Sequence, residues 1–288
     1  MRILHLDAGK EMRGGQRQVL RLIEGLAAAG VESTLLARRD APLFTAARIQ
    51  GWRVEPLGIT HALACLRGHT LIHAHDARSH SLGLLLPARP LVVSRRVAFP
   101  VGSGPVGSRW KYARPRRYLA VSRFVKQVLM EGGVPEEKIG VVHDGVPVLE
   151  ISHGQQVLGL EKDSAILAGM GLRMVTRLEE ELRDAAILVY VTHSEGLGSG
   201  ALLAMSAAVP VIASNVGGLG EVIRHGENGL LVENREDAIA GAIRQLLDDP
   251  ERARQIGAAA RRTVLERFTV GRMVAGTLEA YRDVLASY

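Results

Sequence analysis

Residues 193–233 read HSEGLGSGALLAMSAAVPVIASNVGGLGEVIRHGENGLLVE, and they carry the strongest indication of the fold class. It follows the apolar run AILVYVT at 186–192, which is typical of a buried strand. A glycine-rich turn, a run of small apolar residues and a second apolar run, VPVIAS at 209–214, come next. A strand, turn, helix and strand in this order indicate a parallel sheet, because parallel strands are joined by crossover helices.

The same alternation of apolar runs and helical patterns extends along the whole chain, so we expect an α/β fold with helices on both faces of parallel sheets. The other expected strands are MRILHLD (1–7), ESTLLAR (32–38), TLIHAHD (70–76), PLVVSRR (90–96), YLAVS (118–122), IGVVHDGV (139–146), AILAGM (165–170) and GLLVE (229–233). The expected helices include 16–31, 122–133, 236–249, 250–268 and 269–288.

Periodicity is lost over 147–160, which places a domain boundary there. We therefore expect a first Rossmann-like domain at 1–155 and a second at 156–270. A C-terminal helix at 271–288 is expected to pack back toward the first domain. A chain of 288 residues is long enough for two such domains.

The composition excludes several classes of protein. Hydrophobic residues make up 47% and charged residues 23%, as in ordinary globular proteins. Aromatic residues make up only 4%, which disfavours base-stacking platforms and a nucleic-acid partner. Cys65 is the only cysteine, so no internal disulfide forms, and residues 1–7 lack the apolar core of a signal peptide. These features predict a cytoplasmic protein.

Charge is distributed unevenly between the two halves. Residues 1–150 carry a net charge of +10 and residues 151–288 carry −4. A basic first half indicates an anionic partner, such as an acidic membrane face or a phosphorylated substrate, although a solvated basic surface has the same composition. The stretch SRWKYARPRRY at 108–118 mixes cations with Trp110, Tyr112 and Tyr118, which suits an anionic membrane surface.

Three candidate sites lie where expected strands end, which is where parallel sheets bind ligands. The first is Gly14-Gly15, where backbone N–H groups at a helix start favour phosphate; a plain tight turn is the alternative. The second is HAHDARSH at 73–80. We interpret His75 and Asp76 as a polar pair that contacts ligand rather than as part of a metal site with His73 and His80, and histidines bonded to neighbouring backbone are a further alternative.

The third candidate site is the turn Glu195-Gly-Leu-Gly198-Ser199-Gly200. A helix cap would explain the carboxylate but not the glycines, whose N–H groups form a cradle of donors beside an acceptor. Donors for phosphate and an acceptor for hydroxyls suit a nucleotide sugar. The turn also fits a dinucleotide fingerprint loosely, but the next strand ends at Asn215 rather than at an acid.

The stretch from Glu195 resembles the carboxyl-terminal signature of retaining glycosyltransferase family 4, whose members have the two-domain GT-B fold. The family pattern is Glu, Gly-Phe-Gly, and a second Glu eight positions after the first, followed by Ala-Met. Here it reads Glu195-Gly-Leu-Gly198 and then Leu203-Ala-Met205. Residues 1–32 and 118–146 are similar to the family's amino-terminal glycine loop and its approach to the second domain.

The sequence departs from the family pattern at three points. Leu203 stands where the family has the acid that holds the nucleotide ribose. About two βα units, on the order of 60 residues, are missing from the second domain, together with the family's Arg/Lys pair; Arg173 or Arg177 would be the substitutes. Arg96 stands about where the family often has a histidine.

The resemblance implies a hexosyltransferase that moves a sugar from a nucleoside-diphosphate sugar with retention and without a metal or cofactor. Glu195, Arg96, His75 and Asp76 are the expected catalytic residues. The expected donor-binding residues are Gly14, Gly15, Gly198, Ser199, Gly200 and Leu203. Leu203 then marks an altered ribose contact, or a helix face freed for packing when the domain shrank.

The expected acceptor is a glycan or lipid-linked glycan, and the expected process is cell-envelope polysaccharide or lipopolysaccharide synthesis. The basic first half then places the protein peripherally on the inner face of the membrane. Two other classes stay open. A degenerate, non-catalytic relative that binds nucleotide or glycan agrees with the missing units and Leu203, and a nucleotide-cofactor oxidoreductase agrees only with the glycine turn.

Overall fold

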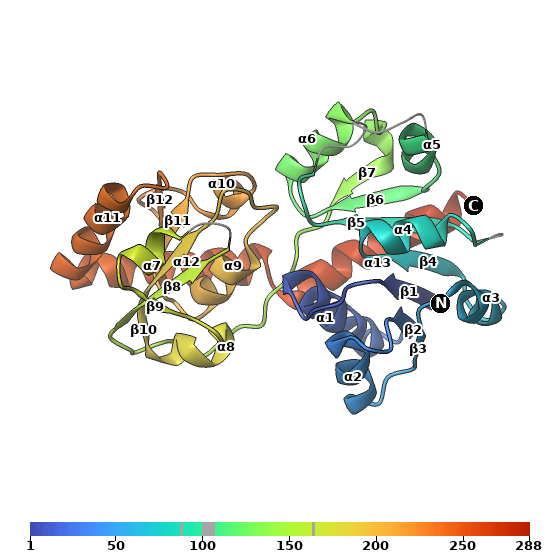
Figure 1. The fold of residues 1–288 in the computed structure, drawn as a ribbon, viewed down its shortest axis with the longest axis horizontal. Coiled ribbons are helices and arrows are strands. Elements are labelled where there is room, and N and C mark those ends of the chain that lie inside the picture. Colours follow the sequence, from blue (N-terminus) through green and yellow to red (C-terminus); the bar gives the residue numbers. More distant parts are fainter. Residues whose placement is uncertain (87–88, 100–106, 163–164) are drawn as a thin grey trace. The chain divides into compact units, whose positions relative to one another are not determined.

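A computed structural model describes residues 1–86, 89–99, 107–162 and 165–288, whose contacts form two compact units (Figure 1). Unit 1 comprises Met1–His143 and Val270–Tyr288, and unit 2 comprises Asp144–Thr269. The sequence analysis places the boundary at 155, whereas residues 144–155 lie with unit 2. One reason is that the Ser152 hydroxyl bonds to backbone carbonyls of unit 2, at 2.9 Å from Arg183 O and 2.7 Å from Ala185 O.

Unit 1 contains a sheet whose described strands are all parallel, in the order β3-β2-β1-β4-β5-β6-β7. The strands are β1 (Arg2–Asp7), β2 (Glu32–Ala37), β3 (Val54–Pro56), β4 (Leu71–Ala74), β5 (Leu91–Arg95), β6 (Arg117–Ala120) and β7 (Ile139–Val141). The helices are α1 (Gly14–Ala28), α2 (Pro42–Ile49), α3 (Ile59–Leu66), α4 (Ala77–Gly83), α5 (Gly107–Ala113), α6 (Arg123–Glu131), the 3-10 turn η1 (Glu136–Lys138) and α13 (Val270–Ala286).

The C-terminal helix α13 lies in unit 1, although it follows unit 2 in the chain. Its residues Met273 and Val274 share one apolar core with Leu22 and Leu26 of α1. The two helices approach closely at Gly25, where an added Cβ would lie 2.4 Å from a Val274 methyl group. This core covers one face of the sheet, so the chain returns from unit 2 to complete unit 1.

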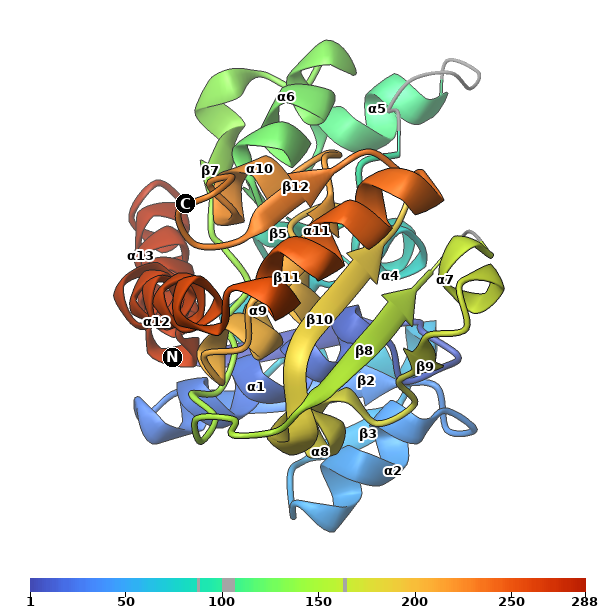
Figure 2. The same cartoon turned by 90° about the vertical axis from the view of Figure 1, so that its left-hand side faces the viewer.

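Unit 2 contains a second sheet of parallel strands, in the order β12-β11-β10-β8-β9 among its described residues (Figure 2). The strands are β8 (Gln156–Glu161), β9 (Arg173–Met174), β10 (Ala185–Val191), β11 (Val211–Ser214) and β12 (Leu230–Val232). The helices are α7 (Ile166–Gly169), α8 (Leu178–Glu181), η2 (Leu182–Asp184), α9 (Ser199–Ser206), α10 (Leu219–Val222), α11 (Glu236–Asp248) and α12 (Pro250–Arg267). The expected α/β class with two parallel sheets is confirmed.

One expected strand is wrong. The run AILAGM at 165–170 contains the short helix α7, and the strand lies earlier, at β8, in the segment where the sequence shows no clear period. The Glu161 carboxylate explains the helix, because it accepts the N–H of Ile166 at 2.7 Å and of Leu167 at 3.2 Å. Such a bond satisfies donors that a first helical turn leaves open.

None of the helices in the described ranges is both long and apolar enough to cross a bilayer.

Candidate functional site

In unit 2 the predicted acid Glu195 lies at the carboxyl end of the sheet, in the turn that follows β10. Its Oε2 atom accepts hydrogen bonds from Lys162 Nζ and from the hydroxyl of Tyr190, and its Oε1 atom lies 3.0 Å from the N–H of Gly196. The Glu195 side chain is 11% exposed and the Lys162 side chain 47%. The carboxylate is therefore fixed, while the ammonium group beside it still reaches solvent.

Lys162 is a residue that the sequence analysis missed. It follows β8 directly, and β8 pairs with β10, so both side chains emerge at one edge of the sheet. Its Nζ atom also lies 5.2 Å from the centre of the Tyr190 ring. The substitutes expected from the sequence are engaged elsewhere: Arg173 pairs with Glu181 at 2.9 Å, and Arg177 pairs with Glu180 at 3.3 Å.

The glycine turn after Glu195 packs against a second glycine turn, which contains Gly218. Gly198 has φ of +101°, a conformation that residues with a Cβ rarely adopt. A Cβ on Gly218 would lie 1.9 Å from the carbonyl oxygen of Gly196, and the Gly218 N–H donates to the carbonyl of Glu195 at 3.0 Å. The two backbones therefore touch, and this contact fixes the position of Glu195.

Helix α9 begins directly after this turn. Its N-cap residue, Gly198, has no side chain that could cap the amino end, where Ser199 and Gly200 are half-buried. The sequence analysis assigns these two residues and Gly198 to donor binding. Uncapped N–H groups at a helix start are suited to a phosphate oxygen, because the helix dipole adds to their positive charge.

Leu203 lies in the middle of α9, eight residues after Glu195. It is 5% exposed, and every residue of α9 from Ala201 to Ser206 is buried. Of the two interpretations offered by the sequence, this burial favours packing of the helix face. The contact to a ribose that the family acid makes stays a prediction for this position.

In unit 1 the expected catalytic residue Asp76 is the N-cap of α4. Its Oδ1 atom accepts the N–H groups of Arg78 at 2.7 Å and Ser79 at 3.1 Å, and its Oδ2 atom accepts the N–H of Ala8 at 2.6 Å. The carboxylate thus ties the loop after β1 to the start of α4. These bonds give Asp76 a structural role, and its role in catalysis stays a prediction.

Asp7 was missed by the sequence analysis, although it ends β1 at the same edge of the sheet. It is 1% exposed and accepts the N–H of Gly9 at 2.8 Å and the amide of Gln16 at 3.2 Å. Burial is the main cause that raises the pKa of Asp7, and the bond from Gly9 opposes the rise. Asp7 and Gln16 together hold the glycine loop against α1.

Gly14 and Gly15 form the start of α1, as the sequence predicts for a βα turn. No heavy atom lies within 4 Å of the place where a Cβ on Gly15 would stand. The Gln16 side chain caps the helix, because its Oε1 atom accepts the N–H of Arg13 at 3.3 Å. Gly15 itself therefore has open space beside it at the carboxyl edge of the first sheet. Phosphate binding by this glycine pair stays a prediction.

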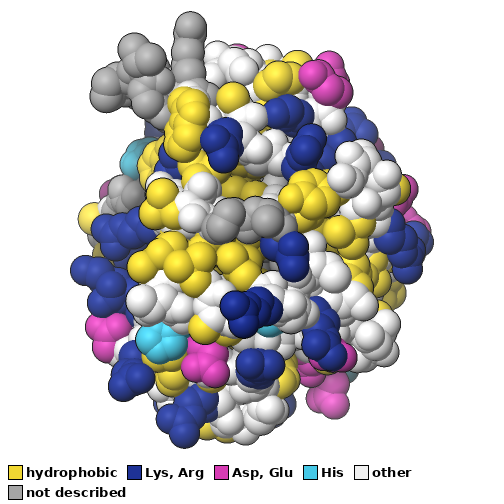
Figure 3. Space-filling model, turned by 90° about the vertical axis from the view of Figure 1, so that its right-hand side faces the viewer, with side chains coloured by type: hydrophobic (Ala, Val, Ile, Leu, Met, Phe, Trp, Pro, Cys, Tyr) yellow, Lys and Arg dark blue, Asp and Glu magenta, His cyan; other side chains and the backbone are white. Residues whose placement is uncertain are grey.

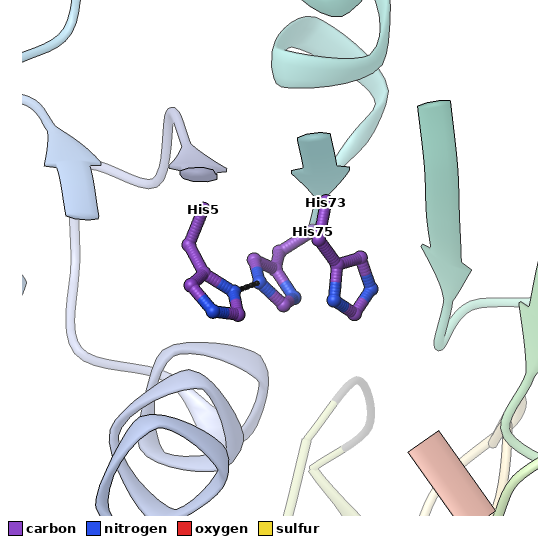
Figure 4. Close-up of side chains that lie close together, drawn as sticks. All are labelled: His5, His73 and His75. Carbon is purple, nitrogen blue, oxygen red and sulfur yellow. Dashed lines mark hydrogen bonds between the residues drawn. The ribbon is translucent and has the colours of Figure 1, made fainter. Parts of the chain in front are cut away.

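Three histidines meet in the core of unit 1 (Figure 4). His5 of β1 is in register with His73 of β4, and His75 follows one residue after that strand. His5 Nδ1 lies 2.9 Å from His75 Nε2, while His73 contacts Tyr281 Oη at 2.5 Å and Ser94 Oγ at 2.8 Å. The sequence analysis placed only His73 and His75 on a common face.

Burial is the main cause that lowers the pKa of each of these three histidines, to about 3 for His5 and well below the usual value for His73 and His75. Electrostatic repulsion from His69 lowers the pKa of His5 further. His5 and Arg96 do the same for His73, and His73, His5 and Arg96 do so for His75. Because a charged imidazole is costly in a buried site, all three rings are neutral at pH 7.

The cluster offers three imidazole nitrogens within 4.8 Å of one another, as a metal site would. The donor set does not fit a divalent cation, however. The nitrogens of His73 are already bonded to two hydroxyls, the cationic Arg96 Nη1 lies 3.5 Å from His75 Nδ1, and no carboxylate belongs to the cluster within the described chain. His80 lies apart, with its ring 5.4 Å from that of Tyr112.

Arg96 directly follows β5, and its side chain lies beside His75. Its Nη1 atom is 3.5 Å from His75 Nδ1, and the side chain is half-buried. Arg95, by contrast, is buried and donates to the carbonyl of Phe99 at 2.8 Å. Of this arginine pair, only Arg96 therefore contacts a predicted catalytic residue.

Two parallel-sheet α/β units with glycine turns at their carboxyl edges are the architecture of GT-B glycosyltransferases. Solved glycosyltransferase structures align with nearly all of the chain. Anabaena HepE in complex with UDP and glucose aligns with a TM-score of 0.84 and 16% identity, over 98% of this chain and 100% of that one. A glycosyltransferase from Rickettsia africae aligns with a TM-score of 0.81 and 17% identity, over 99% and 98%.

Two family profiles identify the family itself. "Glycosyltransferase Family 4" matches residues 12–148, and "Glycosyl transferases group 1" matches residues 170–263. The chain belongs to this glycosyltransferase family, as the resemblance in its sequence suggested. The residues of the second profile include Glu195 and its glycine turn, which are the residues that carried the resemblance.

Curated relatives are similar over shorter stretches. Alpha-maltose-1-phosphate synthase of Mycolicibacterium smegmatis is 39% identical over 117 residues, which are 38% of this chain and 30% of that protein. The glycogen synthase of Mycobacterium tuberculosis is 29% identical over 195 residues, 63% of this chain and 47% of that protein. The chain therefore spans about a third to a half of the length of these relatives.

Proposed function

We propose that the protein transfers a hexosyl group from a nucleoside-diphosphate sugar to a hydroxyl acceptor, with retention of configuration. The observation that supports this most is the pair of Glu195 and Lys162 beside the glycine turn of unit 2. It combines a fixed carboxylate, a cation that reaches solvent and uncapped helix N–H groups. A sugar diphosphate needs this combination, because it carries hydroxyls at one end and negative charge at the other.

Each group has a separate role in this proposal. Glu195 accepts hydrogen bonds from the sugar hydroxyls, and Lys162 takes the place of the family's cationic pair beside the diphosphate. The N–H groups at the start of α9 bind phosphate oxygens. As the bond to the sugar breaks, negative charge grows on the leaving diphosphate, and fixed donors stabilise that charge without reorganising.

Unit 1 has positive charge of its own. Arg96 and the amino end of α1 at Gly14 and Gly15 carry it at the carboxyl edge of the first sheet. His75 is neutral there and offers a lone pair rather than a charge. The family pattern requires no metal or cofactor, and we propose none.

The nucleotide of the donor is proposed to be uridine diphosphate. HepE, whose fold this chain shares, has been solved in complex with UDP and with UDP-glucose. The family assignment also replaces the oxidoreductase alternative. Release of nucleoside diphosphate from a nucleotide sugar tests the proposal, because release requires both binding and cleavage of the donor.

The acceptor is proposed to be a glycan or lipid-linked glycan at an anionic membrane, in cell-envelope polysaccharide or lipopolysaccharide synthesis, with the protein bound peripherally. The face in Figure 3 shows hydrophobic side chains among Lys and Arg, which are more frequent there than Asp and Glu. Trp110 is 54% exposed, with the guanidinium of Arg114 4.9 Å from the centre of its ring, and Arg116 lies 5.6 Å from the ring of Tyr288, which is 60% exposed.

Replacing Arg114 and Arg116 with Ser is expected to weaken binding to anionic vesicles by about tenfold or more, since each cation near such a surface contributes about 1 kcal/mol. Arg117 is left intact because it donates to the carbonyl of Glu137 at 2.8 Å within the fold. Vesicle sedimentation at low and high salt measures the effect. Arg39→Ser with Arg48→Ser, at exposed positions before α2 and in its last turn, is the matched control. Equal binding by both double variants would refute the membrane surface.

A further inference from the structure

The buried histidines form a hydrogen-bond chain with a fixed direction. A guanidinium group can only donate, so the contact of 3.5 Å from Arg96 Nη1 requires His75 Nδ1 to accept. A neutral imidazole has one N–H, which must then lie on Nε2 of His75. That N–H donates to His5 Nδ1, which lies 2.9 Å away.

The same reasoning continues at the next ring. Because His5 Nδ1 accepts, the single N–H of His5 lies on Nε2, and its partner at 3.3 Å is the hydroxyl oxygen of Ser33 on β2. The chain thus runs from Arg96 through His75 and His5 to Ser33. His5 is 0% exposed and His75 6% exposed, so water does not substitute for either ring.

His73 differs from its two neighbours. Its partners, Tyr281 and Ser94, are both hydroxyls that can donate or accept, so neither tautomer of His73 is selected. Its ring centre lies 4.1 Å from that of His75, which packs the two rings together without a bond between them. His73 is therefore a packing neighbour, and the direction of the chain is set by His5, His75 and Arg96.

We propose that His5 is a positioning residue, which through His75 holds the Arg96 guanidinium in place at the carboxyl edge of the first sheet. This rests on the proposed function, in which the charge of Arg96 takes part in sugar transfer. Without an acceptor at position 5, the buried Nε2–H of His75 has no partner, and the His75 ring turns or changes tautomer. Arg96 then loses its contact with His75 Nδ1.

The matched pair of variants is His5→Leu, which removes the acceptor, and His5→Asn, whose amide oxygen stands near the place of the imidazole Nδ1. We expect His5→Leu to lower kcat about tenfold with little change in KM, because the charge on Arg96 acts in the transition state. His5→Asn is expected to restore most of kcat. A similar loss in both variants, or an unchanged kcat in His5→Leu, would overturn the proposal.

Two spectroscopic readouts do not depend on activity. In the unmodified protein, ¹⁵N spectra of the imidazoles are expected to show His75 protonated on Nε2 and not on Nδ1, and a His75 ring protonated on Nδ1 would overturn the proposal. In His5→Leu the Arg96 guanidinium signal is expected to move, and an unmoved signal would refute the positioning role. Should the protein release no nucleotide, the proposed function fails while these signals still decide the role of His5.

Discussion

Replacing Glu195 with Gln is expected to lower nucleotide release from a sugar nucleotide by roughly 10- to 150-fold. This range corresponds to the loss of one hydrogen bond to a charged group, about 1.5–3 kcal/mol. The loss has two physical causes. The amide no longer attracts Lys162, and it accepts sugar hydroxyls more weakly than the carboxylate does. Steady-state kinetics of nucleotide release measures the change.

The affinities for the sugar nucleotide and for the bare nucleotide distinguish contact of Glu195 with the sugar from a purely structural role of Glu195. If Glu195 binds sugar hydroxyls, Glu195→Gln weakens the sugar nucleotide much more than the bare nucleotide. Glu227→Gln is the control, because Glu227 is an exposed residue of unit 2 whose ion pair with Arg224 at 2.9 Å lies on the surface. Equal weakening of both ligands by Glu195→Gln would contradict contact with the sugar.

Leu203→Glu is expected to destabilise unit 2 by about 3–5 kcal/mol, because it buries a carboxylate with no partner in the middle of α9. That is a large part of the usual stability of a domain, about 5–15 kcal/mol. Burial raises the pKa of such a carboxyl group above its unfolded value. The penalty is therefore present above the unfolded pKa and shrinks as the pH falls and the folded group takes up its proton.

Urea unfolding at pH 7 and pH 5 measures this penalty. Leu203→Met keeps the volume and is expected to cost less than about 1.5 kcal/mol. An unchanged midpoint in Leu203→Glu would show that position 203 is not packed. An intact fold with tighter donor binding would instead mean that the family's ribose acid still fits there.

The two sheets could be predicted from the sequence because their signals are local. Apolar runs such as 186–192 and 209–214 are bounded by glycine turns, and the turn at Glu195 carries a spacing that is specific to the family. Strand β8 could not be predicted in the same way. Gln156 and Glu161 at its ends are polar. The apolar run that follows begins α7 rather than a strand, because the Glu161 carboxylate accepts the N–H of Ile166.

Lys162 was missed for the same reason, since its role depends on where β8 ends. His5 was missed because its neighbours are distant in sequence: His75 lies 70 positions away, and Tyr281, the partner of His73, lies 208 positions from His73. No residue pattern within MRILHLD indicates that β1 pairs with β4. Asp76 was visible in the sequence, but its bonds to backbone N–H groups depend on the start of α4.

Release of nucleoside diphosphate from a panel of nucleotide sugars tests the transferase proposal most directly. The account predicts that the protein releases UDP from at least one UDP-sugar, that an acceptor glycan accelerates release, and that Glu195→Gln suppresses it. Binding of UDP without release from any sugar nucleotide, with and without acceptors, would contradict transfer and identify a non-catalytic relative. Binding of NAD with no affinity for any nucleoside diphosphate would contradict the donor site itself.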